Sequence, residues 1–363
     1  MTKDIFKLGL IYLATTIIFY GYYVYFGSGR MNTVYKNWDG PSYVIAAKSL
    51  YVPRIATENN MINSKDIRVD WTFLPAHFPL VPLLIRSLSG IGYFQAMIVV
   101  TIVSSMAAIV AFYHLIKSHQ LVKDPLLLAI PLIFLSPRWF IVSHVGGSEP
   151  LFLFFLIMFV NAFLSHRHKG AAVWAALAQV TRPQGALIAV AVLVIALLEL
   201  KKSGKIKKIV STYYPYLLIP LALLSVFSFF YVQTGDFWAF FSAISIFNHT
   251  SLIPFSTFSY ASANIETFWQ EVNALDYVIY LAAIMTLLKQ KLTPLAVLGL
   301  IFFAPLPFLH HSDISRYAIP LLPLAFIAYR DIIATKEFAL ATLLMSPAIM
   351  SYAINFMEFN HGS

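Results

Sequence analysis

Long apolar runs alternate with short polar breaks along most of the chain, a pattern typical of a protein that crosses a bilayer many times. We expect helices over residues 5–26, 92–116, 125–145, 149–165, 171–199, 213–233, 274–289, 293–309, 316–330 and 337–357. The run 171–199 contains Thr181-Arg182-Pro183-Gln184-Gly185 and has lysines on both flanks, so we predict two short helices that meet at an apex. The pattern therefore predicts an all-α polytopic membrane protein with about 11 transmembrane helices.

Composition strengthens this prediction. Hydrophobic residues make up 59% of the 363 positions and charged residues only 11%, which excludes a disordered chain and an ordinary soluble domain. The chain has no cysteine, so disulfides and thiolate chemistry are excluded. The first apolar run follows Lys3 and Lys7 as in a signal peptide, but it lacks a small-residue cleavage site and ends in tyrosines. We interpret it as a retained first helix, and we expect residues 1–363 to form one integral membrane domain.

Charge orients the chain. The formal net charge is +9, but the basic residues fall mostly between apolar runs, so we expect no nucleic-acid partner. Placing Lys201–Lys208 in the cytoplasm puts the N-terminus inside and the C-terminus outside. Two long segments, 27–91 and 234–273, then become extracytoplasmic loops. Within the first, the stretch 43–51 is amphipathic, which predicts an interfacial helix.

After residues 27–71, four arginines break the positive-inside pattern: Arg86, Arg138, Arg182 and Arg316. Lysine would orient a helix equally well, so the consistent choice of arginine favours recognition of phosphate or carboxylate by the planar guanidinium. Snorkelling to the interface is the alternative for each arginine taken alone. Arg182 is the strongest candidate, because an arginine inside an apolar run normally faces a cavity or a partner.

The segment Asn37-Trp38-Asp39-Gly40-Pro41 follows the first helix and supplies a candidate general base. An acid beside Trp38 at the membrane face would be partly desolvated, which suits Asp39 for proton abstraction. The structural alternative is an Asx-turn made by Asp39, with Trp38 as an interfacial residue.

Two further motifs have both a structural and a functional interpretation. Ser148-Glu149-Pro150 is typical of a helix start, with Ser148 as N-cap and Glu149 as a first-turn acid. His310-His311-Ser312-Asp313 precedes Arg316 and Tyr317. Adjacent histidines suggest a metal, but no third ligand has suitable spacing, so we favour binding of an anionic head group by His310 and Arg316.

Taken in order, several motifs form one pattern. They are Trp38-Asp39, His77-Phe78-Pro79-Leu80-Val81-Pro82, Ser148-Glu149, Thr181-Arg182-Pro183-Gln184-Gly185, Tyr231 with Thr234-Gly235-Asp236, and His310 to Pro323. From about residue 30 to residue 325 the chain resembles the mannosyltransferase family that adds the second mannose to glycosylphosphatidylinositol, and its prokaryotic relatives.

The resemblance implies a GT-C glycosyltransferase fold. It also implies transfer of a sugar, mannose in that family, from a polyprenyl-phosphate donor to a glycolipid or glycan hydroxyl, by inverting single displacement with Asp39 as catalytic base. We assign binding of the donor phosphate and substrates to Arg182, Arg316, Tyr317, His310, Glu149, Trp38, His77 and Gln184. No Asp-x-Asp motif lies near Trp38, so we expect a metal-independent reaction without a cofactor.

Two other classes compete with this interpretation. A lipid flippase or transporter would use Arg182 in its substrate pathway and the broken helix as a gate. An acyl- or phosphotransferase would use the His310-His311-Ser312-Asp313 segment as base or nucleophile. For location we favour the plasma membrane of a prokaryote, with the active site outside. The endoplasmic reticulum is the alternative, and Asn248-His249-Thr250 matches a glycosylation sequon.

Overall fold

The computed structural model describes residues 2–27, 30–58, 71–246, 250–259, 267–311 and 313–359. The protein is 82% helical, and its described residues form no strand, which confirms the all-helical expectation. The glycosylation sequon lies mostly outside the described residues, because positions 248 and 249 are not among them.

Among the described residues, six helices are long and apolar enough to cross a membrane, as expected for a multi-pass membrane protein. They are α1 (Thr2–Tyr25), α6 (Tyr93–Ser118), α11 (Ala186–Ser203), the run of α12 (Ile206–Tyr213), η4 (Tyr214–Leu217) and α13 (Leu218–Thr234), α15 (Thr267–Lys289) and α20 (Lys336–Glu358). Their ends lie close to the predicted ones, except that α12 and α15 start earlier than the runs indicated.

Shorter apolar helices lie between the long ones. They are α7 (Pro125–Phe134), α9 (Glu149–Leu164), α16 (Thr293–Phe303) with η6 (Leu306–Phe308), and η7 (Ile319–Leu321) with α18 (Leu322–Ala328). Prolines stand in the first turn of α7, α8 (Pro137–Val142), α9 and α16, where the N–H that proline lacks needs no partner within the helix. The predicted run 125–145 divides into α7 and α8, where Ser136 Oγ accepts a hydrogen bond of 3.2 Å from the Trp139 N–H.

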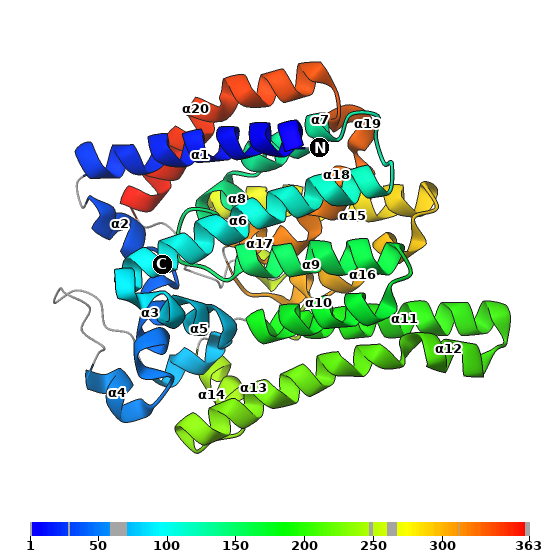
Figure 1. Cartoon of the computed structure of the whole chain (residues 1–363), viewed down its shortest axis with the longest axis horizontal. Coiled ribbons are helices and arrows are strands. Elements are labelled where there is room, and N and C mark those ends of the chain that lie inside the picture. Colours follow the sequence, from blue (N-terminus) through cyan, green and yellow to red (C-terminus); the bar gives the residue numbers. More distant parts are fainter. Residues whose placement is uncertain are drawn as a thin grey trace.

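The predicted break in the run 171–199 is present. α10 (His168–Thr181) ends at Arg182, whose backbone is extended, and a short turn, η3 (Pro183–Gly185), leads into α11. α10 packs along α9 and α13. In Figure 1, the break lies at the same end of the bundle as the first residues of α9.

That end of the bundle also carries the short helices of both predicted outer loops. They are α2 (Met31–Lys36), α3 (Gly40–Ser49), α4 (Pro53–Glu58), η1 (Trp71–Ala76), α5 (Leu80–Ser87), η2 (Ser89–Ile91), α14 (Ala239–Ser245) and η5 (Ser256–Phe258). The turn between α11 and α12, with the lysine run, lies at the opposite end, on the right in Figure 1. The chain thus separates its lysine cluster from its two long polar loops.

The expectation that residues 43–51 form a surface helix is wrong in one respect. The helix forms as α3, but all its residues except Lys48 are buried. α5, α6 and η1 pack around it, and Arg86 of α5 donates hydrogen bonds to the carbonyls of Ala47 (2.9 Å) and Lys48 (3.0 Å) at its C-terminal end. α3 is therefore a core element that holds the residue before it, Asp39.

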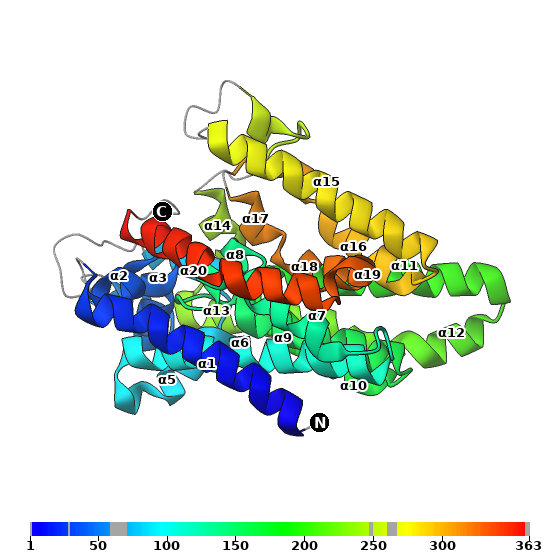
Figure 2. The same ribbon diagram turned by 90° about the horizontal axis from the view of Figure 1, so that it is seen from above.

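The last part of the chain closes over the same region. α17 (Ile314–Tyr317) precedes η7, and α19 (Arg330–Ile333) leads to α20, which packs against α7 and α8 (Figure 2). Near the end of α20, the backbone carbonyl of Met357 accepts a hydrogen bond of 3.1 Å from the Asn37 side chain. Asn37, just after α2, and Met357, in the last helix, are thus joined beside Asp39.

Candidate functional site

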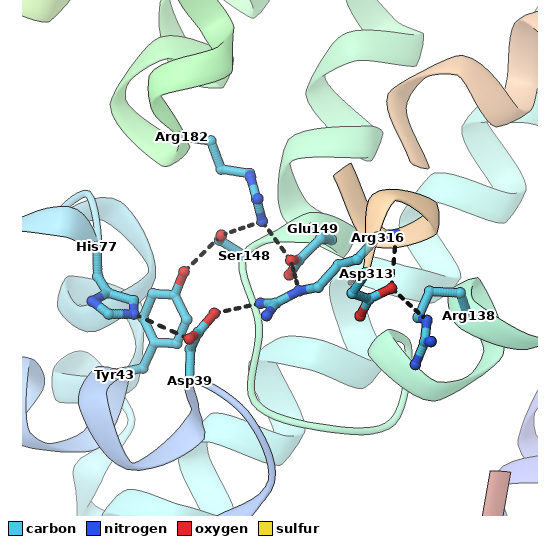
Figure 3. A network of polar contacts seen from close by, with 9 residues as sticks. All are labelled: Asp39, Tyr43, His77, Arg138, Ser148, Glu149, Arg182, Asp313 and Arg316. Atoms are coloured by element: carbon cyan, nitrogen blue, oxygen red, sulfur yellow. Dashed lines mark hydrogen bonds and ion pairs between the residues drawn. The ribbon is translucent and has the colours of Figure 1, made fainter. Parts of the chain in front are cut away.

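Four charged side chains meet at the end of the bundle that carries the short helices (Figure 3). Asp39 precedes α3, Glu149 begins α9, Arg182 occupies the break after α10, and Arg316 lies in α17. Glu149 is only 3% exposed, Arg182 14%, Arg316 15% and Asp39 28%. The structure thus brings together four of the residues that the sequence analysis selected, and Asp39 is the one most open to solvent.

Glu149 joins the two arginines through a single oxygen. Its Oε1 lies 2.7 Å from Nη1 of Arg182 and accepts a hydrogen bond of 2.6 Å from Nε of Arg316. Its Oε2 is buried and has no hydrogen-bond partner. One carboxylate oxygen therefore holds two guanidinium groups within a few ångströms of each other.

Ser148 does not cap α9 as predicted, although Glu149 does stand in the first turn. The Ser148 hydroxyl instead accepts hydrogen bonds from Tyr43 Oη (2.7 Å) and from Arg182 Nη1 (3.0 Å). Tyr43 was missed by the sequence analysis. It lies four positions after Asp39, which is the spacing of one helix face, so this signal was available in the sequence.

Asp39 makes no Asx-turn, because its side chain makes no capping hydrogen bond to α3. Its Oδ2 instead accepts a hydrogen bond from Nη2 of Arg316, and its Oδ1 lies 3.5 Å from Nε2 of His77. Desolvation alone would raise the pKa of Asp39, but the positive charge of Arg316 and the contact with His77 outweigh it. The pKa of Asp39 therefore lies well below its usual range, and the carboxylate is ionised at neutral pH.

Aromatic rings fix the neighbours of Asp39. The His77 ring is 5% exposed and packs edge-on against Tyr43 (centroid distance 4.9 Å) and Phe73 (5.1 Å). The Trp38 ring lies 4.9 Å from the guanidinium carbon of Arg316, within cation–π range. Trp38 has a φ of 47°, a strained backbone conformation for a bulky residue. His77 thus contacts the Asp39 carboxylate, and Trp38 contacts the Arg316 guanidinium group, so each member of the ion pair has an aromatic neighbour.

A second ion pair supports Arg316 from behind. Arg138 Nε lies 2.9 Å from Oδ1 of Asp313, and both side chains are nearly buried. The same Oδ1 accepts a hydrogen bond of 3.3 Å from the Arg316 backbone N–H, at the start of α17. The Arg138 guanidinium also lies 4.4 Å from the ring centre of Phe356 in α20. Arg138 and Asp313 therefore position the backbone that carries Arg316.

Glycines allow the segments to approach. A Cβ on Gly146 would lie 2.7 Å from the Cα of Gly40, and a Cβ on Gly147 would lie 2.6 Å from Oε2 of Glu149. Both distances are shorter than a carbon side chain tolerates. Gly146 thus lets the loop before α9 lie directly against the start of α3, and Gly147 leaves room for the Glu149 carboxylate.

Other predicted site residues lie nearby without joining this network. His310 Nδ1 lies 3.3 Å from Ser256 Oγ, and the half-buried Tyr317 packs its ring against His311 at 5.2 Å. Gln184 is half-buried in η3, and among the described residues no hydrogen bond joins it to the four charges. In Thr234-Gly235-Asp236, the Thr234 hydroxyl and the Asp236 carboxylate bond to their own turn and to Ser242.

The four arginines that break the positive-inside pattern therefore all have polar partners within the described part of the chain. Arg138, Arg182 and Arg316 bind carboxylates, as their planar guanidinium groups suggested. Arg86 differs, because it binds only backbone carbonyls at the end of α3. None of the four needs to be explained as an interfacial residue.

The site balances its own charge yet keeps free donors. Two arginines face two carboxylates, so the four charges sum to zero. Nε and Nη2 of Arg182 and Nη1 of Arg316 have no hydrogen-bond partner within the described part of the chain. An anion with several oxygens can therefore bind both guanidinium groups without first breaking every internal contact.

Comparison of the sequence with protein-family models and with curated proteins gives no match. Within the described residues, no group of three or more His, Cys, Asp or Glu side chains could hold a metal ion. Function must therefore be inferred from the geometry of the site itself.

Proposed function

We propose that the protein is a membrane glycosyltransferase of the GT-C type. It transfers a sugar, mannose by the family resemblance, from a polyprenyl-phosphate donor to a hydroxyl group of a glycolipid or glycan. Asp39 acts as the general base, and Arg182 and Arg316 bind the donor phosphate. The observation that carries this proposal is the convergence of both arginines on one oxygen of Glu149, with Asp39 on the far side of Arg316.

The reaction needs few groups. Asp39 takes the proton from the acceptor hydroxyl while the acceptor oxygen bonds to the anomeric carbon of the sugar. The bond between that carbon and the phosphate oxygen breaks, and the electron pair leaves with the polyprenyl phosphate. The phosphate gains one negative charge in this step. Preorganised guanidinium groups stabilise such developing charge more than they stabilise the ground state.

Donor binding would also prepare the base. Arg316 holds Asp39 in an ion pair that weakens the carboxylate as a base. A phosphate that draws Arg316 toward itself removes the group that lowers the pKa of Asp39, so the carboxylate becomes more basic. Proton abstraction from the acceptor hydroxyl then follows donor binding instead of preceding it. The acceptor is therefore not deprotonated before a donor is bound.

The proposed membrane frame follows from charge. We propose that, with the lysine turn between α11 and α12 in the cytoplasm, the shorter apolar helices and α10 cross the membrane in addition to the six long helices, which would give about 11 crossings. The short helices α2 to α5, with Asp39, then face the extracytoplasmic side. The plasma membrane of a prokaryote is the proposed location. Cysteines placed singly at Ser203 and Ser251 of this cysteine-free chain should be labelled by an impermeant thiol reagent from opposite sides.

A transfer assay tests the function. Purified protein in liposomes is incubated with labelled polyprenyl-phosphate mannose and a lipid extract. We expect label in a new glycolipid together with an equal amount of released polyprenyl phosphate. Movement of the intact donor across the bilayer without sugar transfer would instead establish the transporter alternative, in which Arg182 serves the pathway. Donor that remains unchanged on its original side, in every lipid extract tried, would refute the proposal.

A further inference from the structure

The turn between α11 and α12 carries an unusually dense positive charge. Lys201, Lys202, Lys205, Lys207 and Lys208 are all exposed. None of them forms an ion pair within the described part of the chain. Arg167 and Lys169 are exposed at the start of α10, which packs against η4 directly after α12. The end of the bundle away from the candidate site thus presents a surface in which basic side chains outnumber the acid Glu199 of α11, and Glu199 forms no ion pair with these lysines within the described part of the chain.

The same surface has an apolar side. Ile206 is 62% exposed, Val210 60%, Tyr214 53% and Leu217 63%. These positions are spaced by three or four residues, so they form one stripe. Leu218 and Leu221 continue it onto α13, within the same candidate membrane span. By helical spacing Lys208 lies on the other side of α12, whereas Lys207 borders the stripe next to Ile206, Val210 and Tyr214.

Length places α12 at the level of lipid head groups. The continuous run Ile206–Thr234 has 29 residues, which corresponds to roughly 43 Å of helix, whereas a hydrocarbon core is about 30 Å thick. About two turns therefore extend beyond the hydrocarbon at one end. We place this extension at the lysine end, because Lys205, Lys207 and Lys208 belong at the level of the head groups and not in the hydrocarbon.

We propose that the basic end of α11 and α12 is a docking surface for the head groups of anionic phospholipids. The apolar stripe lies among acyl chains, and the lysines contact the phosphate groups of the adjoining leaflet. Charge complementarity selects this partner, because five lysines without acidic partners attract a negatively charged surface. The inference does not depend on the reaction proposed above, since the surface is at the opposite end of the bundle from α3, the helix that Asp39 precedes (Figure 1).

The chain is free of cysteine, so a single reporter can be placed on α12. Val210→Cys carries an environment-sensitive fluorophore, in nanodiscs of phosphatidylcholine with or without phosphatidylglycerol. Energy transfer to head-group-labelled phosphatidylglycerol measures local enrichment of that lipid. We expect enrichment around α12 that high salt abolishes. Replacing the five lysines by glutamine should lower it tenfold or more, because each lysine near an anionic surface favours partitioning about fivefold.

Two controls make the outcome decisive. Replacing the five lysines by arginine keeps the charge and should keep the enrichment. Ile332→Cys, in α19, is a matched position with 65% exposure but without a lysine cluster, and it should report little enrichment. Equal energy transfer at both reporters, or enrichment that survives in the five-glutamine variant, would overturn the proposal. Energy transfer that does not change with salt concentration would also overturn the proposal.

Discussion

Nη1 of Arg182 lies 2.7 Å from Oε1 of Glu149, although Arg182 stands in a helix break and Glu149 in the first turn of a neighbouring helix. An arginine inserted into an apolar run needs such a partner, because an isolated charge at that depth is costly. The same Glu149 oxygen also receives Arg316. Glu149 is therefore the residue on which the arrangement of both cations depends.

Changing Glu149→Gln should test this dependence. The amide keeps the volume but leaves two adjacent guanidinium groups with one fewer negative charge, and breaking a buried pair costs about 3–5 kcal/mol. We expect a lower thermal midpoint in detergent. A soluble polyprenyl-phosphate analogue should restore more stability to the variant than to the wild type. Glu337→Gln, at an exposed position in α20, is the control. A midpoint equal to that of the wild type would contradict the bridging role.

Asp39→Asn should remove proton abstraction while leaving the donor site. General-base removal lowers turnover by about 10² to 10⁴, and the loss should appear in kcat with little change in the KM for the donor. Binding of the phosphate analogue, measured by calorimetry, should persist because Arg182 and Arg316 remain. Transfer at a near-normal rate in Asp39→Asn would assign the base to another residue.

The stability of the Arg316→Gln variant should depend on pH differently from the stability of the wild type. In the wild type, the ion pair between Asp39 and Arg316 contributes stability that is fully present above the ordinary Asp pKa of about 3.9. This stability is lost only as the pH falls through the lowered pKa of Asp39. Without Arg316, desolvation raises that pKa, so Asp39 takes up a proton at higher pH and its unfavourable charge disappears. The gap in thermal midpoint between wild type and variant should therefore narrow from pH 7 to pH 5.

His77 also faces Asp39, so the double change Arg316→Gln with Asp39→Asn is the necessary control. Its midpoint, compared with that of Asp39→Asn alone, should show no such narrowing. If the double variant narrows as much as the single one, the pH dependence belongs to His77 or to another group.

Gly146→Ala tests the close approach of α3 and the loop before α9. The new Cβ would lie 2.7 Å from the Cα of Gly40, and overpacking of this kind costs about 1–3 kcal/mol. Transfer should fall further than the stability loss explains, since Asp39 and Glu149 move apart. Gly170→Ala in α10 is the matched control, because its Cβ meets no atom within 4 Å. Normal transfer by Gly146→Ala would show that the spacing is not critical.

Local rules predicted some of this structure and missed other parts for identifiable reasons. The ends of α6 and α20 follow from apolar length, and the break at Arg182 follows from Pro183 and Gly185. The inward direction of Arg182 follows from the cost of exposing it to lipid. The role of Ser148 could not be predicted, because its hydroxyl accepts hydrogen bonds from Tyr43 and Arg182, which are distant from it in the sequence. The burial of α3 was missed for the same reason, since α5, α6 and η1 cover it.

The pairing of Asp39 with Arg316 also bears on the biogenesis of the protein. The two residues are separated by 277 positions, and ribosomes add about 5–20 residues per second. Asp39 therefore leaves the ribosome tens of seconds before its cation exists. Glu149 and Arg182, only tens of positions apart, can pair much earlier. A nascent chain at this stage holds the Glu149–Arg182 ion pair but lacks Arg316, so the proposed transfer reaction would begin only after the segment that carries Arg316 has been made.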